Sequence, residues 1–305
     1  MIQDIFPHKL NNHYRPEARP SRNSRVLCYT EEGVLCRLDE DNRTLSFPRV
    51  SEFPSAAKPN QDTKALDTTS LTERAELPLP EESLTYLFSV DDADFFLLYP
   101  EPKAVPEGYL YIPVRKLRAT AAGPKELVFA ALTGLQLYNW YRNNRYCGRC
   151  GGRTIHERTE RAIRCPGCGH LIYPRIVPAV IVGVLSADGK RLLLTKYRTG
   201  FAHYALVAGF TEIGETLEET VAREVMEETG LPVRAIRYYK SQPWGIVDDL
   251  LAGFYCNADD SKPIRMDENE LKLAEWKTRD EIVLQPDDFS LTNEMMMRFK
   301  QGLPC

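Results

Sequence analysis

The alternation of apolar and polar positions divides the chain into an amino-terminal stretch of short strands and a second half of longer ones. Short apolar runs bounded by turn residues predict strands at residues 25–38, 84–89, 95–99 and 110–114. A helix is predicted next, over residues 125–141, because Leu127, Ala131, Leu135 and Tyr138 recur at helical spacing. This helix leads directly into a pair of cysteines.

The second half opens with an apolar run at residues 176–185. An Asp188-Gly189 turn and the run 191–196 follow it, which predicts a β-hairpin. Residues 201–210 come next, and then a helix from about Thr216 to Thr229, ended by Gly230 and Pro232. Further strands are predicted at 235–239, 250–256 and 271–276, and a last helix at 291–301. Strands interleaved with few helices predict a mixed sheet packed between helices.

Composition limits the classes of function. The 305 residues suggest two domains, and 43% hydrophobic with 27% charged residues is ordinary for a globular protein. A net charge of −4 does not favour a protein that coats nucleic acid, although a local basic patch stays open. The start of the chain lacks a basic segment followed by an apolar one, and no apolar run reaches about 20 residues. We therefore expect a cytoplasmic protein with no membrane partner.

Four of the eight cysteines form two close pairs, Cys147 with Cys150 and Cys165 with Cys168, separated by fourteen residues. Two such pairs can supply four thiolates to one tetrahedral Zn²⁺, and glycine or proline beside each pair lets the backbone turn around the metal. Four thiolates leave no position for substrate, so we expect one structural zinc per chain. The alternative is two redox pairs. The scattered Cys28, Cys36, Cys256 and Cys305 are interpreted as ordinary thiols.

The predicted helix near residue 220 carries carboxylates where a core-facing helix carries apolar side chains. At 100° per residue, Leu217, Val221 and Val225 share the face that meets the core, and Glu228 projects inside the same arc. Glu224 lies at the border of this arc.

Glu227 lies to the side of that arc, four residues from Arg223, where ion pairs form. Ionised carboxylates that leave water need compensation, and a divalent cation provides it. Oxygen ligands of this kind suit Mg²⁺ or Mn²⁺. A solvated acidic helix face is the alternative. Gly209 before the helix is interpreted as a place where backbone approaches a phosphate closely.

The helix and its flanks resemble the Nudix box of the Nudix hydrolase superfamily. The matching positions are Gly209, Glu215, Arg223, Glu224, Val225, Glu227, Glu228, Gly230 and Leu231. The resemblance implies an α+β protein with a Nudix α/β/α sandwich around a mixed sheet. It also implies Mg²⁺ or Mn²⁺ at the glutamates and hydrolysis of a nucleoside diphosphate linked to another group.

A four-cysteine zinc ribbon directly before a Nudix domain resembles the NADH pyrophosphatase (NudC-type) subfamily. Tyr173 with the junction at residues 174–178, the segment Ser241-Gln242-Pro243-Trp244, and Glu270 agree with that pattern, and the resemblance covers about residues 141–299. It implies cleavage of NADH or NAD⁺ into AMP and nicotinamide mononucleotide, and a homodimer.

The resemblance also implies roles for particular residues. Catalytic roles fall to Glu228, Glu227, Glu224 and Arg223, and cation binding to Glu224, Glu227, Glu228 and Glu270. Substrate-binding roles fall to Glu160, Tyr173, Ala208, Gln242, Pro243, Trp244 and Thr292, with Tyr173 and Phe210 as possible aromatic faces. Glu228 is the favoured base, with Glu270 or the metal alone as alternatives. A loop anchored by a buried tryptophan is the structural interpretation of Gln242 and Trp244.

The resemblance divides the chain into residues 1–120, a mixed α/β, Nudix-like amino-terminal domain of degenerate character; 121–174, a linker helix and the ribbon; and 175–305, the catalytic domain. The chain departs from the subfamily where Gly245-Ile246-Val247 replaces Pro-Phe-Pro after the tryptophan. In relatives that segment shapes the nicotinamide side of the pocket, so substrate specificity stays open.

Three alternatives to NAD(H) keep the same chemistry: NAD-capped RNA, ADP-ribose and dinucleoside polyphosphates. The RNA alternative needs a basic groove, for which Arg142, Arg145, Arg149 and Arg153 are candidates, although the four could equally form a solvated helix end. The alternative without catalysis is a zinc-ribbon regulatory protein with an inactive Nudix domain. The complete set of glutamates argues against it.

Overall fold

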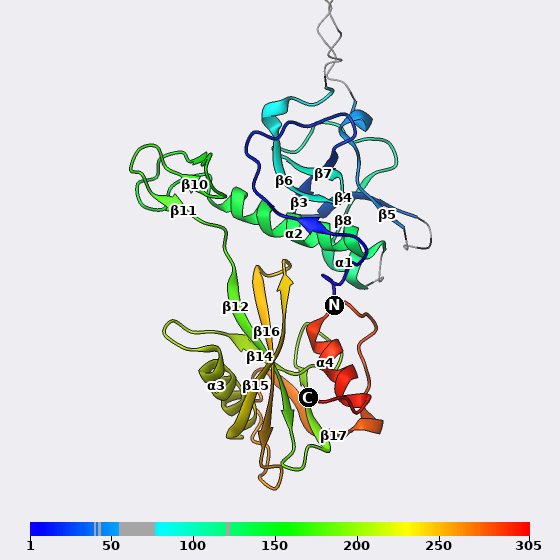
Figure 1. The fold of residues 1–305 in the computed structure, drawn as a ribbon, viewed down its shortest axis with the longest axis vertical. Coiled ribbons are helices and arrows are strands. Elements are labelled where there is room, and N and C mark those ends of the chain that lie inside the picture. Colours follow the sequence, from blue (N-terminus) through cyan, green and yellow to red (C-terminus); the bar gives the residue numbers. More distant parts are fainter. Residues whose placement is uncertain (40, 42–43, 55–76, 120–122) are drawn as a thin grey trace, which may run out of the picture. The chain divides into compact units, whose positions relative to one another are not determined.

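The computed structural model describes residues 1–39, 41, 44–54, 77–119 and 123–305 (Figure 1). They divide into two compact units, one made of residues Ile5–Pro174 and the other of Met1–Asp4 together with Arg175–Cys305. No helix among the described residues combines the length and the apolar character needed to cross a bilayer.

Two small sheets make up the first part of the amino-terminal unit. One has the order β1-β6-β7-β2, with β1 at Leu10–Asn11, β2 at Arg25–Leu27, β6 at Leu84–Val90 and β7 at Ala93–Leu98. The other contains β3 at Tyr29–Thr30, β4 at Gly33–Leu38, β5 at Leu45–Ser46 and β8 at Leu110–Ile112. The predicted strands in this region are confirmed, but 25–38 divides into three. Val26, Leu35 and Phe96 are fully buried in one shared core.

Helices follow the sheets in this unit. The predicted helix is confirmed as α2, Lys125–Asn143, which begins after Pro124. A short helix α1, Val114–Ala119, starts at the residue where the sequence predicted the end of a strand. Six residues are too few for hydrophobic periodicity to separate a helix from a strand. Two single turns of 3₁₀-helix, η1 at Val50–Glu52 and η2 at Glu81–Ser83, complete the unit.

A three-stranded antiparallel sheet of order β11-β10-β9 accompanies the cysteine pairs: the first pair precedes β9, and the second lies between β10 and β11. Its strands are β9 at Ile155–His156, β10 at Ile163–Arg164 and β11 at Leu171–Ile172. Each pair lies in a tight turn that ends on a glycine, Gly151 with φ 74° and Gly169 with φ 72°. The amide N–H groups of these glycines donate to the carbonyls of Cys147 and Cys165. Glycine is needed at both places because positive φ costs other residues energy.

A six-stranded mixed sheet forms the centre of the carboxy-terminal unit. Its order is β15-β16-β12-β13-β17, and β14 also pairs with β12. The strands are β12 at Val177–Leu185, β13 at Arg191–Tyr197, β14 at Val207–Phe210, β15 at Val233–Trp244, β16 at Asp249–Ala258 and β17 at Leu271–Thr278. The β12 and β16 strands are parallel and the other pairs antiparallel.

The predicted hairpin of β12 and β13 is antiparallel and pairs at Leu185 and Leu192, but most of β13 pairs with β17. The alternative that Gln242 and Trp244 belong to a loop is wrong, because both residues lie at the end of strand β15. Pro243 is tolerated there because β15 is an edge strand, where a missing N–H leaves no gap in the sheet.

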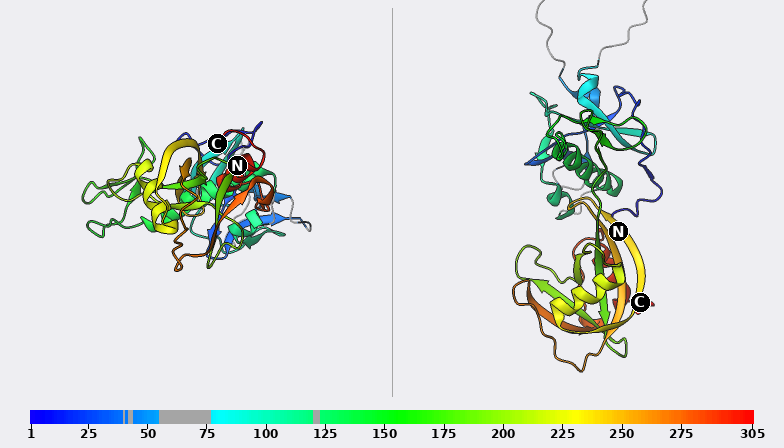
Figure 2. Two further views of the ribbon diagram at one scale, coloured as in Figure 1. Left: turned by 90° about the horizontal axis from the view of Figure 1, so that it is seen from below. Right: turned by 90° about the vertical axis from the view of Figure 1, so that its left-hand side faces the viewer.

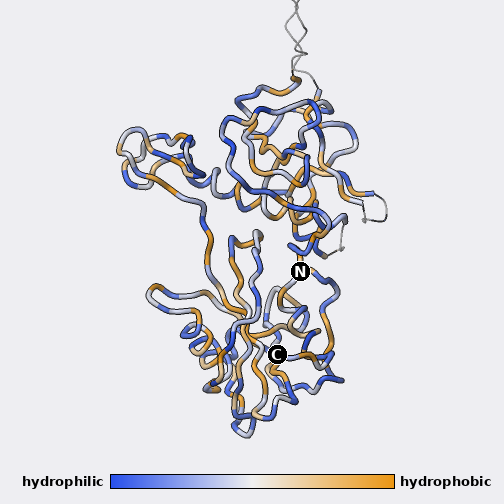
Figure 3. Tube along the Cα trace, viewed as in Figure 1, coloured by the Kyte–Doolittle hydropathy of each residue, from blue (hydrophilic) through white to orange (hydrophobic). Residues whose placement is uncertain are grey.

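One helix covers each face of this sheet, as the two predicted helices require (Figures 1 and 2). Along β12, Val180, Val182 and Val184 point toward α3, Leu217–Thr229, while Ile181 and Leu185 point toward α4, Leu291–Lys300. Successive strand residues face opposite sides, so a continuous apolar run serves both cores. Figure 3 shows this run as a hydrophobic stretch of the tube. A 3₁₀-turn η3, Arg279–Glu281, precedes α4, and the predicted α/β/α sandwich with a mixed sheet is confirmed.

Candidate functional site

Helix α3 begins and ends where the sequence predicts. The Thr216 hydroxyl accepts from the Glu219 N–H while the Glu219 carboxylate accepts from the Thr216 N–H, which forms a capping box. At the other end Gly230 takes a left-handed conformation with φ 71° and its N–H donates to the Met226 carbonyl. Both ends are fixed by local hydrogen bonds, so the rotation of the helix face is set by its sequence.

Glu228 is buried at the core-facing side of α3, as predicted, with 2% of its surface exposed. Its Oε1 lies 3.4 Å from the Ala208 N–H, and its Oε2 is buried with no hydrogen-bond partner. Burial, together with the charges of Glu224 and Glu270, raises the pKa of Glu228 to about 8. A buried carboxylate oxygen without a donor costs free energy, and a bound cation would remove that cost. Glu228 therefore fits a cation ligand.

Arg223 holds the other acidic side chains in place. Its guanidinium donates twice to Glu215, at 2.6 and 2.9 Å, and once each to Glu224 at 2.7 Å and Glu227 at 3.0 Å. A fifth hydrogen bond, 2.9 Å long, reaches the Phe210 carbonyl at the end of β14. The Arg223 contact lowers the pKa of Glu215 to about 2. The guanidinium is fully occupied by protein groups, which makes Arg223 a positioning residue.

Gly209 has a role that the sequence did not suggest. It lies within strand β14, and a Cβ built on it would lie 1.9 Å from Cδ of Glu224. The missing side chain makes room for the Glu224 carboxylate. The close approach of this backbone to a phosphate stays a prediction, and the structure adds a close approach to a carboxylate on the neighbouring helix.

Glu270, the last of the predicted cation ligands, lies just before β17 and is exposed. It is close enough for its charge to raise the pKa of both Glu224 and Glu228. The structure thus brings Glu224, Glu228 and Glu270 into one electrostatic group. Glu227 is also exposed, and it contacts Arg223.

Two residues that the sequence reasoning missed belong to the same group. The charge of Asp267 contributes to the raised pKa of Glu228, and its backbone N–H donates to the Glu228 carbonyl. Tyr197, at the end of β13, is mostly buried, and its pKa is raised by burial and then by the charges of Glu228 and Glu270. No motif in a single sequence marks either residue, because Tyr197 lies on a distant strand and Asp267 lies in the segment before β17, far from α3 in the sequence.

The side chain of Gln242 is committed to the fold. It is fully buried, and its Nε2 donates to Oε1 of Gln3 at 3.1 Å and to the Phe289 carbonyl at 2.7 Å. Its Oε1 accepts from the Leu291 N–H at 2.7 Å and so holds the first residue of α4. Three protein contacts leave little capacity for a ligand. The structural interpretation fits Gln242, although a strand and not a loop carries it.

The other predicted substrate residues divide between the two units. In the carboxy-terminal unit, Trp244 is buried, Pro243 is exposed and Thr292 is partly buried in the first turn of α4. Ala208 offers its N–H toward Glu228, and Phe210 leaves 53% of its surface exposed.

In the amino-terminal unit, the structure brings Glu160 and Tyr173 together, since the Tyr173 hydroxyl donates to Oε1 of Glu160 at 3.0 Å. Tyr173 is also exposed, at 54%. The sequence names these two residues separately as substrate-binding candidates, and the structure adds that their side chains are hydrogen-bonded to each other.

The segment that departs from the subfamily pattern leads into a buried acidic pair. Asp248 has φ 64°, and both it and Asp249 have an Oδ1 that is buried without a hydrogen-bond partner. Burial, with the charge of Asp248, raises the pKa of Asp249 to about 7. This pair lies at the start of β16, opposite Val177 of β12. The sequence reasoning noted the departure but missed the two carboxylates.

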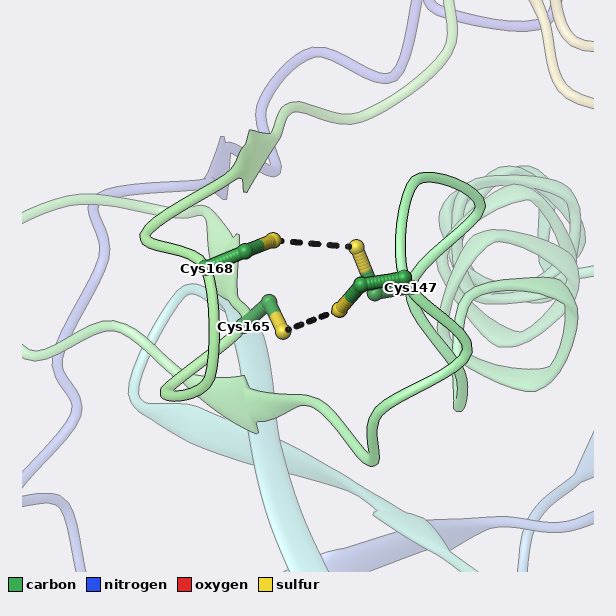
Figure 4. A group of neighbouring side chains, drawn as sticks. Cys147, Cys165 and Cys168 are labelled. Carbon is green, nitrogen blue, oxygen red and sulfur yellow. Dashed lines mark hydrogen bonds between the residues drawn. The ribbon is translucent and has the colours of Figure 1, made fainter.

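The four predicted zinc ligands converge (Figure 4). Their sulfur atoms all lie within 4.8 Å of one another, with Cys147 Sγ 3.6 Å from Cys168 Sγ and Cys150 Sγ 3.5 Å from Cys165 Sγ. Tetrahedral zinc with bonds of about 2.3 Å would place the sulfurs roughly 3.8 Å apart. The N–H of Arg149 lowers the pKa of Cys147 to about 7, which favours the thiolate. The cysteines therefore fit one zinc ion, with no disulfide formed.

Within the described part of the chain, these four cysteines are the group of His, Cys, Asp or Glu residues whose ligand atoms all lie within 4.8 Å of one another. The carboxylates around α3 are more widely spread.

Comparisons with known proteins agree with this geometry. The NUDIX domain family model matches residues 175–299, and the NADH pyrophosphatase zinc ribbon domain model matches residues 142–173. The chain is 38% identical over 180 residues to the NAD-capped RNA hydrolase NudC of Photorhabdus laumondii, which covers 59% of this chain and 69% of that protein. It is 42% identical over 154 residues to the protein of the same name from Shigella flexneri, covering 50% of this chain and 59% of that protein.

A crystal structure of a NUDIX hydrolase from Nitrosomonas europaea is 25% identical, covers 53% of this chain and 95% of that one, and gives a TM-score of 0.44. The two family models fall on the same two regions that hold the cysteine cluster and the glutamate-bearing helix. The chain therefore belongs to the Nudix hydrolases, in the NADH pyrophosphatase group that carries a four-cysteine zinc ribbon.

Proposed function

We propose that this chain hydrolyses the pyrophosphate bond of NADH or NAD⁺ and releases AMP and nicotinamide mononucleotide. The observation that carries the proposal is the buried, unpartnered Oε2 of Glu228 beside Glu224 and Glu270, on the helix of a family whose members are hydrolases. Relatives named NAD-capped RNA hydrolases support a substrate with an NAD-type pyrophosphate. An inactive regulatory protein would have no need for this costly arrangement of carboxylates.

The residues fit Mg²⁺ or Mn²⁺, which prefer carboxylate oxygens. Glu228, Glu224 and Glu270 would hold the cation, and Glu227 would join them by leaving Arg223. Such a cation supplies neutralising charge for the diphosphate and acidifies the attacking water. The unequal burial of these four carboxylates supports a site that keeps a position for substrate.

The chain's own residues would then act in defined ways. A water oxygen attacks one phosphorus, the bridging P–O bond breaks, and the second phosphate leaves with the bridging oxygen. The proton of the attacking water goes to a carboxylate, for which Glu228 is favoured because its Oε2 is buried at the site with no protein partner. Arg223 keeps Glu215, Glu224 and Phe210 in fixed positions during this step, and Gly209 leaves the space that Glu224 occupies.

An NAD-capped RNA 5′ end is the second candidate substrate, because it contains the same pyrophosphate bond and appears in the names of both relatives. The Gly245-Ile246-Val247 departure and the Asp248–Asp249 pair beside it leave the preference between the small dinucleotide and the capped RNA open. A homodimer stays a prediction of the family resemblance, and a cytoplasmic location stays a prediction of the sequence pattern.

A panel of substrates tests the proposal. The zinc-loaded protein is incubated with Mg²⁺ or Mn²⁺ and NADH, NAD⁺, ADP-ribose, a diadenosine polyphosphate or NAD-capped RNA, and AMP or 5′-phosphorylated RNA is quantified. We expect cation-dependent release of AMP from NADH or NAD⁺ at rates at least tenfold above those for ADP-ribose and diadenosine polyphosphate. If the protein hydrolyses neither NAD(H) nor NAD-capped RNA in the presence of both cations, the proposal is contradicted.

A further inference from the structure

A cavity lies entirely within the amino-terminal unit, apart from the α3 carboxylates. It has a volume of about 480 Å³ and is bounded by strands β6 and β7, the end of α2 and the beginning of the ribbon. Its walls carry three arginines and three tyrosines, namely Arg142, Arg145, Arg153, Tyr99, Tyr138 and Tyr141. Nothing in the proposed hydrolysis uses these side chains.

Neutral groups, and not carboxylates, hold two of these arginines in place. Arg145 Nη1 donates to the Tyr99 hydroxyl at 2.9 Å, and its guanidinium carbon lies 5.5 Å from the centre of the Tyr99 ring. Arg142 Nη1 is 3.4 Å from the Tyr138 hydroxyl, with its guanidinium carbon 5.7 Å from that ring centre. Because the two tyrosines are uncharged, they position both guanidiniums without cancelling the positive charge, and Glu31 acts on Arg142 only through the charge of its carboxylate.

Aromatic rings that pack against one another form one wall of the cavity. Tyr138 packs face to face with Tyr29, with ring centres 5.2 Å apart, and its hydroxyl end reaches the cavity beside Tyr99. Tyr141 lies against the His156 ring at 4.7 Å, with 30° between the planes, and both residues line the cavity. Flat aromatic surfaces beside guanidiniums are the combination that holds a base and its phosphate.

The remaining charged group of the lining is Glu82. One carboxylate against three guanidiniums leaves the cavity positive, and the bulk charge of −4 makes that local excess of cations stand out. A carboxylate also accepts hydrogen bonds from a ribose hydroxyl or an exocyclic amine of a base. The lining thus combines a positive region with a single acceptor at its border.

We propose that this cavity is a nucleotide-binding site, separate from the α3 carboxylates, that holds a phosphate on Arg142, Arg145 and Arg153 and a base against its aromatic wall. Its volume lies within the range of roughly 300–1,000 Å³ that small-molecule sites occupy. The ligand is a nucleoside monophosphate unit, either free or as one nucleotide of an RNA strand. The proposal does not depend on the hydrolytic function.

Direct binding to the full-length, zinc-loaded protein tests this site. The probe is a 3′-fluorescein-labelled, 5′-phosphorylated RNA octamer, followed by fluorescence anisotropy at several salt concentrations without added Mg²⁺. We expect Arg145→Gln to weaken binding about tenfold, which corresponds to about 1.4 kcal/mol, because the variant loses a charged hydrogen-bond donor to the phosphate. The steepness of log K against log salt should fall by about 0.7 for each phosphate that the variant no longer neutralises.

Arg158→Gln is the matched control, because Arg158 is an exposed arginine of the same ribbon, does not line the cavity and is not one of the four arginines considered for an RNA groove. We expect its affinity and salt slope to equal those of the wild type. Zinc content and thermal unfolding are measured for every variant, and if the triple variant Arg142→Gln, Arg145→Gln, Arg153→Gln unfolds early, the single substitutions decide. Wild-type affinity in the cavity variants, or equal losses in Arg158→Gln, would overturn the proposal.

Two competitors then identify the source of the nucleotide. Displacement of the octamer by free AMP in the wild type, but not in Arg145→Gln, would show that the cavity accepts a single nucleotide. Displacement by unlabelled octamer alone would show that it accepts a nucleotide within a strand. An octamer of abasic units that binds as tightly as RNA would overturn the base contact. Rates of NADH hydrolysis in the arginine variants separate a failure of this site from a failure of the proposed hydrolase.

Discussion

The ribbon cysteines and the α3 carboxylates are both candidates for metal ligands, and they differ in how completely they are arranged. The four sulfur atoms already lie within 4.8 Å of one another. Around α3, Glu228 is buried with a free oxygen, Glu224 and Glu227 contact Arg223, and Glu270 is exposed. A closed, equivalent set of ligands suits a metal that supports the fold, whereas an unequal set with a free oxygen suits one that also contacts substrate.

The two sites also differ in the length of chain that positions them. Each cysteine pair is shaped by a turn of a few residues that ends at Gly151 or Gly169. The carboxylates depend on α3, on strand β14 through Gly209 and on the segment before β17. A change in a distant strand can therefore disturb the carboxylates while the cysteines keep their geometry.

Replacement of Glu228 by glutamine should give the largest effect and separate the two sites. The amide keeps the size of the side chain but cannot accept a proton or carry the charge that a cation needs. We expect turnover of NADH to fall by about 10²–10⁴-fold, the range for loss of a general base. Zinc content, measured by atomic absorption, should stay at one per chain. More than a tenth of wild-type activity would remove Glu228 from the proposed role.

Replacement of Cys165 by serine should have the reverse pattern. Cys165 is fully buried among the other three sulfurs, so its loss leaves an incomplete zinc site. We expect zinc binding to be lost and the thermal midpoint to fall, since structural zinc stabilises small domains strongly. The Mg²⁺ concentration for half-maximal hydrolysis by the remaining folded protein should not change. A variant that retains one zinc per chain would contradict the four-cysteine assignment.

Replacement of Gly209 by alanine should disturb the carboxylate site from the neighbouring strand. The new Cβ would lie 1.9 Å from Cδ of Glu224, so this flexible carboxylate must move. We expect activity at a fixed, subsaturating Mg²⁺ concentration to fall by about 10–100-fold, as for other groups that orient metal ligands, with partial recovery at higher Mg²⁺. Gly148→Ala in the ribbon is the control, because nothing lies within 4 Å of its added Cβ. Equal Mg²⁺ dependence in both variants would refute the packing argument.

The pH dependence of unfolding tests Glu228 in the absence of substrate. Glu228 has a pKa of about 8 in the folded protein against roughly 4.3 when unfolded, so the folded state binds the extra proton between these values. For the zinc-loaded protein without Mg²⁺ or Mn²⁺, the free energy of unfolding should therefore fall as pH rises from about 4.3 to 8. The contribution of Glu228 to this fall is at most about 1.4 kcal/mol per pH unit. The loss should be complete above pH 8.

Chemical denaturation at several pH values measures this slope. In Glu228→Gln the fall should be shallower, and the remaining part should end near pH 7, where Asp249 titrates. Mg²⁺ should stabilise the wild type most at pH 8 and have little effect on the variant. A slope unchanged by the substitution would show that Glu228 does not bind the extra proton.

The sequence alone predicts the parts of the molecule that depend on local residues. Thr216 and Gly230 determine both ends of α3, and helical periodicity places Val221, Val225 and Glu228 on its buried face. The cysteine spacing likewise predicts a cluster, because each pair and its glycine form a self-contained turn. In these regions, chemistry and secondary structure are specified within a few residues.

Features that depend on strand pairing could not be predicted in the same way. Gly209 shares its surroundings with Glu224 only once β14 lies beside the helix, so its role as a space for that carboxylate is absent from any motif. Tyr197 and Asp267 likewise join the site only through the folding of distant segments. Gln242 looks like a ligand for substrate in sequence, but the carbonyl of Phe289 and the amide of Leu291 lie within its reach.

The assignment of residues Met1–Asp4 to the carboxy-terminal unit affects how the protein can be dissected. Within that unit, the Ile2 N–H donates to the Phe289 carbonyl at 2.9 Å, and Gln3 contacts both Gln242 and the Ser241 carbonyl. A fragment that starts at residue 175 therefore lacks the hydrogen bonds that hold the segment leading into α4. It also exposes apolar surface that the fully buried Ile2 covers. Expression of the catalytic half by itself would need those few residues grafted back or supplied as a peptide.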